Sequence, residues 1–326
     1  MVSRKTLVVS GMVFAGSCLA AESGQGDCIA SSIQPEAIDL DKPRDQLARQ
    51  SDLVIPEDAR IASIRVLRRP IFDTTDPEQD NALYRTLITP TWESALRAQL
   101  VFEEGDVYEP ELISESERVL RQREYLTAAW VGVTRVCGNE VEVSVLTRDT
   151  WTLFPSVGVS RSGGENTTNF GLSDPNFAGS GKSLGIGYAK DPDRTETSLY
   201  FDDPNVLGSH WQAGFSFDER SDGRGRGAYL ERPFFSETTN WRFGLSGIDD
   251  VREESRYVGA EAIADYRRSQ EFFSIDGGWR LAERNDRQLR LLAGYRYNAL
   301  MFDRLPNEPD LDIFPDDRTL SYPWIG

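Results

Sequence analysis

Asp174-Pro-Asn-Phe177, Asp203-Pro-Asn-Val206 and Arg232-Pro-Phe-Phe235 are the stretches that decide the fold of this chain, because their prolines recur at intervals of 29 residues. An interval of this length holds two strands of about 10 residues and two connections, which are the dimensions of a hairpin in a membrane-spanning barrel. Since the interval covers a whole hairpin, we expect the three proline turns to lie on one side of a common sheet.

Residues between and after these turns alternate between apolar and polar types. Ile186, Phe215, Phe243 and Ile275 belong to the apolar set, and their sequence neighbours are polar, charged or glycine. A soluble β-sandwich would alternate in the same way. The membrane alternative is favoured by aromatic residues beside the turns, which are typical of an interfacial girdle: Phe177, Trp211, Phe234, Phe235 and Trp241. We therefore expect Ile186, Phe215, Phe243 and Ile275 to face lipid.

The composition argues against several classes of protein. The chain has 326 residues and a formal charge of −17, from 53 acidic and 36 basic side chains, which disfavours nucleic-acid binding. One histidine and three cysteines argue against a four-coordinate zinc site. No run of about 18 apolar residues follows the amino terminus, so a membrane role would have to use strands. We predict no catalytic, cofactor-binding or metal-binding residues.

The amino terminus has the order of a secretory signal peptide. Arg4 and Lys5 precede an apolar stretch that ends in small residues at Ala20 and Ala21. We expect residues 1–21 to be removed, and we consider a retained membrane anchor the weaker alternative. Residues 22–58 hold few apolar positions and several glycines and prolines, which is typical of an extended leader or linker.

Residues 59–150 predict a small α/β domain. Gly138-Asn139 is a two-residue hairpin turn between two alternating strands, and Glu109-Pro110 suits the first turn of a helix. The expected elements are a strand over Arg60–Leu67, a helix over Trp92–Leu100 capped by Thr91, a second helix from Glu109, and the hairpin strands Ala129–Val136 and Glu140–Leu146.

Two polar motifs carry no chemistry in our interpretation. Gly179-Ser-Gly-Lys-Ser183 ends like a phosphate-binding loop, but Asn176 stands where the first glycine should be and a strand pattern follows. His210 lies at a junction between a turn and a strand, where a solvated or interfacial histidine is expected.

The segment from Phe102 to Leu120, followed by Tyr125-Leu126 and the valine-rich hairpin, resembles a POTRA domain, the periplasmic module of BamA/TamA-type outer-membrane proteins. The stretches Asp174–Ser183, Lys190–Thr195 and Asp203–Ser209 look like the opening hairpins of their barrels. The resemblance implies a mostly β fold, in which a POTRA-like α/β domain over 59–150 precedes an antiparallel transmembrane β-barrel over 151–326.

The same resemblance implies a function and a location. It implies a protein that assists the insertion or translocation of polypeptides at the bacterial outer membrane, with its N-terminal domain in the periplasm. The implied partners are outer-membrane lipids, unfolded or secreted polypeptide clients and periplasmic accessory proteins, with no cofactor and no enzymatic chemistry. The alternatives are a barrel pore or barrel enzyme that shares only the architecture, and a periplasmic β-sandwich binding protein.

The chain departs from the family in the extent of its barrel. Family barrels have sixteen strands, whereas residues 151–326 supply about ten or eleven, and the Val-Arg-Gly-Phe segment of the family does not occur. We expect a fragment rather than an atypical smaller relative, because a barrel with an unpaired wall cannot satisfy its backbone in lipid.

In POTRA domains one strand usually lies at a sheet edge, and our candidate is the strand with Ala129, Val131, Val133 and Arg135. An exposed edge would let an extended client add as a further strand. The alternative is that the leader over 22–58 or the barrel rim covers this edge.

Cys28 and Cys137 are the cysteines that remain after removal of a signal peptide. An oxidising compartment permits a disulfide between them, and Cys137 abuts the accessible hairpin turn. Free or buried thiols are an equal alternative.

Overall fold

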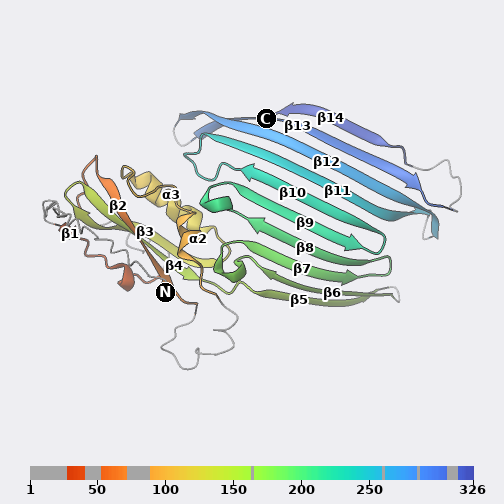
Figure 1. Cartoon of the computed structure of the whole chain (residues 1–326), viewed down its shortest axis with the longest axis horizontal. Helices are drawn as coiled ribbons and strands as arrows, with labels where there is room; N and C mark the ends of the chain where they lie inside the picture. Colours follow the sequence, from red (N-terminus) through yellow and green to blue (C-terminus); the bar gives the residue numbers. More distant parts are fainter. Residues whose placement is uncertain are drawn as a thin grey trace, which may run out of the picture.

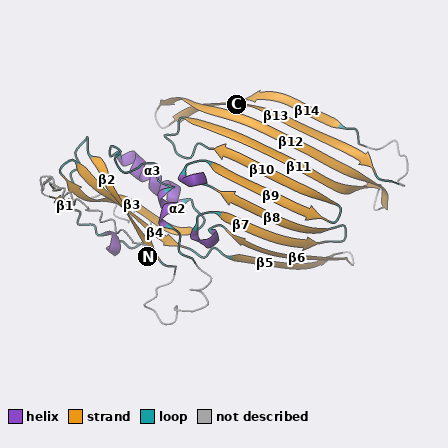
Figure 2. Ribbon diagram, viewed as in Figure 1, coloured by secondary structure: helices purple, strands orange, loops and turns teal. Residues whose placement is uncertain are grey.

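The computed structural model describes residues 28–40, 53–71, 89–162, 165–258, 261–284, 287–306 and 315–326. The predicted signal peptide and part of the predicted leader lie outside the described residues. Figure 1 and Figure 2 show two parts side by side, a small α/β domain and a broad antiparallel sheet.

The α/β domain contains a four-stranded sheet in the order β1-β3-β4-β2. Its strands are β1 (Cys28–Ala30), β2 (Arg60–Arg69), β3 (Leu126–Cys137) and β4 (Glu140–Asp149), and its helices are the 3₁₀ turn η1 (Pro35–Ala37), α2 (Glu93–Arg97) and α3 (Pro110–Arg121). β3 and β4 form the predicted hairpin around Gly138-Asn139, while β2 runs parallel to β4. The expected strand, hairpin and second helix are therefore confirmed.

Two apolar clusters hold this domain together. The larger lies between the helices and the sheet and includes Leu96, Leu120 and Val143, none of which has a side chain more than 1% exposed. The smaller joins Ile38 and Leu40 to Trp130, so part of the predicted leader packs against the other side of the sheet.

The expected first helix needs a correction. α2 covers only Glu93–Arg97, its N-cap is Trp92, and no side chain caps it. Thr91 does not cap the helix because its hydroxyl and its backbone N–H both donate to the buried carboxylate of Asp149.

The second part is a ten-stranded antiparallel sheet in which strands neighbour each other in chain order. Its elements are β5 (Phe154–Ser162), β6 (Glu165–Asp174), η2 (Phe177–Gly179), β7 (Ser183–Lys190), β8 (Thr195–Asp203), η3 (Val206–Gly208), β9 (Gln212–Arg220), β10 (Gly223–Arg232), β11 (Trp241–Val258), β12 (Glu261–Arg284), β13 (Arg287–Arg304) and β14 (Arg318–Ile325). Among the described residues β5 and β14 do not pair, so these strands form an open sheet. The mostly β fold is confirmed.

The strand register separates two faces of this sheet. Residues that pair across neighbouring strands share a face; Leu184 opposes Phe201, which opposes Phe215. We call this side the apolar face. Its side chains exposed to between 37% and 73% include Val157, Phe170, Leu172, Ile186, Phe215, Leu230, Phe273, Ile275, Trp279, Leu291 and Tyr295. A soluble sheet would cover such a face with a core.

The opposite side, the polar face, carries charges and glycines. Arg220 forms ion pairs of 2.7 Å with Glu196 and 2.6 Å with Asp250 there. Glycine is needed at Gly185 because a Cβ atom would lie 2.0 Å from the ring of Tyr200 on the next strand. The ring of Tyr200 thus lies over a glycine on the polar face, while apolar side chains project from the other face.

Candidate functional site: the junction between the α/β domain and the proline turns

The α/β domain contacts the large sheet at three connections, those between β6 and β7, β8 and β9, and β10 and β11. We call residues 174–183, 203–211 and 232–240 turns 1, 2 and 3, and their contact surface with the α/β domain the junction. All three turns lie at the same end of the sheet, next to α2 and α3, as their spacing predicts (Figure 1).

Turns 1 and 2 have the same backbone design. Asp174 accepts a hydrogen bond from the backbone N–H of Asn176 at 2.9 Å, and Asp203 accepts the matching bond from Asn205 at 3.0 Å. One residue other than glycine in each turn has a left-handed backbone, Ala178 with φ 53° and Leu207 with φ 54°. The repeated Asp-Pro-Asn sequence therefore builds two copies of one docking element.

Turn 1 binds at the start of α2 through a buried polar chain. Asn176 donates from Nδ2 to Thr91 Oγ1 at 2.8 Å, and Thr91 Oγ1 donates to Asp149 Oδ1 at 2.8 Å. The Asn176 Oδ1 atom accepts from the backbone N–H of Gly181 at 2.7 Å. Burial raises the pKa of Asp149, although two hydrogen bonds from Thr91 act in the opposite direction.

The backbones of turn 1 and α2 approach closely. The N–H of Trp92 donates to the carbonyl of Gly179 at 2.7 Å. A Cβ atom at Gly179 would lie 2.4 Å from the carbonyl oxygen of Pro90, and the residue has φ +76°. Only glycine meets both requirements, so this position is fixed by the docking of the α/β domain.

Turn 2 binds the other end of α2. The Nδ2 atom of Asn205 donates to the carbonyl of Ala98 at 2.9 Å and to that of Ser209 at 3.0 Å. The side chain of Gln99 donates to Asn205 Oδ1. The asparagines of turns 1 and 2 thus form hydrogen bonds next to the two ends of the same short helix.

Turn 3 binds α3 through a charged group. Glu115 accepts from the backbone N–H of Glu237 at 2.9 Å and from two nitrogens of Arg118 at 2.6 and 2.7 Å. Hydrogen bonds from Arg118 hold the pKa of Glu115 below its ordinary value, against the effect of burial.

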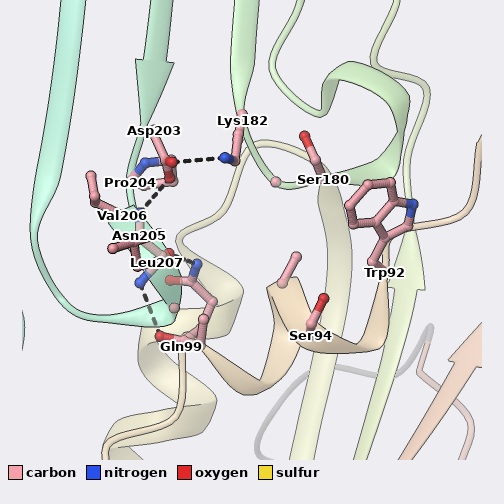
Figure 3. A pocket seen from close by; sticks show the side chains of 14 residues that line it. Trp92, Ser94, Gln99, Ser180, Lys182, Asp203, Pro204, Asn205, Val206 and Leu207 are labelled. Atoms are coloured by element: carbon pink, nitrogen blue, oxygen red, sulfur yellow. Dashed lines mark hydrogen bonds and ion pairs between the residues drawn. The ribbon is translucent and has the colours of Figure 1, made fainter.

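A groove of about 260 Å³ lies between α2 and the first two turns. Lys182 and Asp203 form an ion pair of 2.8 Å in its wall. Trp92, Gln99 and Leu207 are among the other lining residues (Figure 3). The groove therefore combines one pair of opposite charges with large apolar side chains.

His210 packs beside the junction. Its ring stacks on that of Phe235, with centroids 3.7 Å apart. Burial, together with the charges of Arg232 and Arg123, lowers the pKa of His210 to about 4. The imidazole is therefore neutral near pH 7.

The four residues predicted to face lipid share the apolar face. Ile186, Phe215 and Ile275 are 55%, 47% and 38% exposed. Phe243 is half-buried because its ring packs against Trp211, with centroids 6.0 Å apart.

The edge predicted to be free on β3 is covered in part, by the short strand β1 at one end and by side chains of α3 farther along. β1 pairs with β3 from Arg135 to Cys137, and the N–H of Ser31 donates to the carbonyl of Thr134. Further along, Val131 N–H donates to Glu117 at 3.3 Å, and the carbonyl of Ala129 accepts from Arg121 at 3.4 Å. The pairing with β1 does not reach Val133. Unpaired edge groups attract any available partner, and here the chain's own leader and α3 provide it.

Cys28 and Cys137 are joined by a disulfide in the structure, at the outer end of the β1–β3 pairing. The bond ties the covering strand to the edge that it covers.

Sequence reasoning missed the residues of the α/β domain that receive the turns, namely Thr91, Gln99, Glu115 and Asp149. The signal available was the asparagine repeated in the two Asp-Pro-Asn stretches, Asn176 and Asn205. If these side chains are buried, each needs hydrogen-bond partners. The identity of the partners depends on how the two parts meet.

The contacts at the junction are hydrogen bonds that hold the α/β domain against the three turns. Within the described ranges no group of three or more His, Cys, Asp or Glu side chains is arranged to hold a metal ion. None of the described helices has the length and apolar character needed to cross a bilayer.

No protein-family model and no curated protein matches the chain. Among solved structures it is similar to BamA from Haemophilus ducreyi lacking POTRA domains 1-3, at 14% identity over 76% of this chain and 56% of that chain, with a TM-score of 0.40. It is also similar to CdiB from Acinetobacter baumannii, at 13% identity over 76% of this chain and 47% of that chain, again with a TM-score of 0.40. The chain thus spans about half the length of these two proteins, and similarity at this level leaves its function to be argued from its own residues.

Proposed function

We propose that this chain belongs to an outer-membrane β-barrel protein of the POTRA-barrel type, which assists the insertion or translocation of polypeptides. The observation that carries the proposal is the docking of an α/β domain on three successive turns at one end of a sheet whose exposed face is apolar. Such a face suits a sheet surrounded by lipid, with charges such as Arg220 kept on the other side. The α/β domain then lies in the periplasm.

The junction would fix the position of the α/β domain relative to the sheet. Three turns hold the α/β domain through Asn176, Asn205 and Glu237, so a client bound to the domain would stand at a constant place relative to the first strands. The end of β3 that pairs with β1, from Arg135 to Cys137, is not available to a client. Clients would therefore bind the remaining edge of β3 or another surface of the domain or the sheet.

The test is assembly of a client barrel in liposomes that contain the purified full chain. An unfolded eight-stranded outer-membrane barrel is added, and its conversion to a protease-resistant form is followed over time. We expect faster conversion than in empty liposomes, and slower conversion with Asn176→Ala than with wild type. Asn169→Ala, an exposed asparagine on β6, is the matched control and should behave as wild type.

Equal rates with and without the chain would contradict the proposal. Release of an entrapped dye without faster client assembly would support the pore alternative instead. A chain that stays soluble without detergent and does not enter liposomes would support the β-sandwich alternative.

A further inference from the structure

Arg232 breaks the repeat of the three proline turns. Turns 1 and 2 begin with Asp174 and Asp203, and turn 3 begins with Arg232 at the same spacing of 29 residues. Each aspartate accepts a hydrogen bond from the backbone N–H two residues further on, which closes its turn. A guanidinium group has no acceptor atom, so Arg232 does not repeat the role of the aspartates.

The guanidinium group of Arg232 lies in an aromatic cluster on the apolar face. The register places Arg232 opposite Phe243. The guanidinium carbon of Arg232 lies 4.1 Å from the ring centroid of Trp241 and 5.0 Å from that of Phe235. Trp211 packs against Trp241 with centroids 6.2 Å apart. Cation–π contacts of this kind hold a positive charge against the faces of the rings.

No carboxylate among the described residues forms an ion pair with Arg232. One of its nitrogens donates to the backbone carbonyl of Trp241 at 2.7 Å, which is a neutral acceptor. Asp174 and Asp203, at the same end of the apolar face, accept hydrogen bonds within their own turns, and Asp203 also pairs with Lys182. A guanidinium group has five N–H donors, so Arg232 retains donors for an anion from outside the chain.

The side chains around Arg232 indicate which anion this is. Trp241 and Trp279 pair across β11 and β12 and are 41% and 54% exposed. Tryptophan is enriched where the headgroups of a bilayer meet its hydrocarbon core. Toward the middle of the sheet the same face continues with Leu230, Leu245 and Ile275, which pair with one another in that order. In a bilayer around the sheet, lipid phosphates would therefore stand beside the tryptophans, with acyl chains along the leucines.

We propose that Arg232 binds the phosphate group of an anionic phospholipid, such as phosphatidylglycerol, in the periplasmic leaflet. Its guanidinium donates to the phosphate oxygens, while Trp241 and Phe235 keep it in place and the upper acyl chains lie along Leu230. A zwitterionic headgroup would add an ammonium group, for which the described residues offer no uncommitted carboxylate at this end of the apolar face. The site therefore prefers a headgroup of net negative charge. This inference rests on the proposed membrane location of the sheet.

The experiment compares two lipids at two labelled positions of the full chain in liposomes. A fluorescent label is attached to Leu230→Cys, two residues from Arg232, or to Ile186→Cys on β7 of the same face. Cys18 is replaced by serine in every variant, and the other two native cysteines form a disulfide that the label does not modify. Every liposome contains phosphatidylglycerol and phosphatidylcholine in equal amounts, and only one of the two is brominated on its acyl chains.

We expect both labels to be quenched. At position 230 phosphatidylglycerol should be enriched over phosphatidylcholine by about fivefold, whereas at position 186 the two lipids should quench equally. Arg232→Gln should remove the preference at position 230, and Arg232→Lys, which keeps the charge, should retain most of it. Arg226→Gln is the matched control and should change nothing, because Arg226 is an exposed arginine on the same strand and face, toward the other end of the sheet.

The outcomes separate the lipid site from the membrane location. Equal quenching by the two lipids at position 230 overturns the site and leaves the membrane location intact. A preference that survives Arg232→Gln, or that also appears at position 186, overturns the assignment to Arg232. No quenching at either position overturns the proposed function itself.

A second variant keeps Arg232 and its bond to Trp241. Phe243→Glu places a carboxylate opposite Arg232 on the neighbouring strand, so the chain supplies its own anion and the preference at position 230 should disappear. Phe243→Gln, which has nearly the same shape and no charge, should retain the preference. An unchanged preference in Phe243→Glu overturns the proposal.

Discussion

Replacing Asn176 with alanine should loosen the α/β domain from the sheet more than the same replacement at Asn205. Asn176 is only 4% exposed, so water cannot replace its hydrogen bonds. The variant loses the bond to Thr91, worth about 0.5–1.5 kcal/mol net, and leaves the buried N–H of Gly181 without its acceptor, at about 1–3 kcal/mol. The docked state should therefore lose about 2–4 kcal/mol.

Hydrogen exchange measured by mass spectrometry reads this loss directly. The N–H of Trp92 is protected by the carbonyl of Gly179 across the junction. Because about 1.4 kcal/mol is a factor of ten, exchange in the peptide over residues 89–100 should speed up by roughly 30- to 1,000-fold. Asn205→Ala should have a smaller effect, since Asn205 is half-buried and its carbonyl partners can turn to water.

The matched control is Asn169→Ala on β6, which should leave exchange at residues 89–100 unchanged. Unaltered protection in Asn176→Ala, or a larger effect of Asn205→Ala, would refute the argument from burial. Equal acceleration over the whole chain would show that the variant unfolds globally instead of opening at the junction.

Three further predictions concern pH and the membrane. The pKa of His210 is lowered from 6.5 to about 4, so between these pH values the unfolded chain binds a proton that the folded chain does not. The free energy of unfolding should therefore fall as pH drops from 6.5 to about 4. In urea titrations over this range, His210→Phe, which keeps a ring on Phe235, should show a smaller decline. The pKa of Glu115 is held below its ordinary value by Arg118, so the contribution of this carboxylate to stability is present above the unfolded-state pKa and is lost as pH falls through the lower folded-state pKa; hydrogen exchange around Glu237 should therefore accelerate on acidification, relative to intrinsic exchange, and Glu115→Gln should lack this response. Phe215 lies in the middle of β9, so Phe215→Arg should destabilise the folded protein in lipid by about 2–4 kcal/mol. Phe243 lies near the start of β11 beside Trp241, so Phe243→Arg should destabilise it by only about 0–1 kcal/mol. Equal losses in unfolding titrations in lipid would contradict the assigned depths.

Local patterns in the sequence were enough to predict much of the fold. The alternation around Ile186, Phe215 and Ile275 determines which side chains share a face, because side chains alternate along a strand whatever it packs against. The equal spacing of Pro175, Pro204 and Pro233 places three turns at one end of the sheet. Gly138-Asn139 and Pro110 are turn and helix signals that act through the backbone of a few neighbouring residues.

Only the tertiary structure decided the partners across the junction and along the edge of β3. Thr91 reads as a helix cap in the sequence, but it bonds to Asp149 and Asn176 because the two parts of the chain bring a carboxylate and an amide to it. The sequence predicts a free edge from Ala129 to Arg135, but α3 contacts this edge at Ala129 and Val131. β1, which is distant in sequence, pairs with its far end from Arg135. Local signals determine strands, helices and faces, whereas contacts between distant segments depend on packing that no periodicity in the chain encodes.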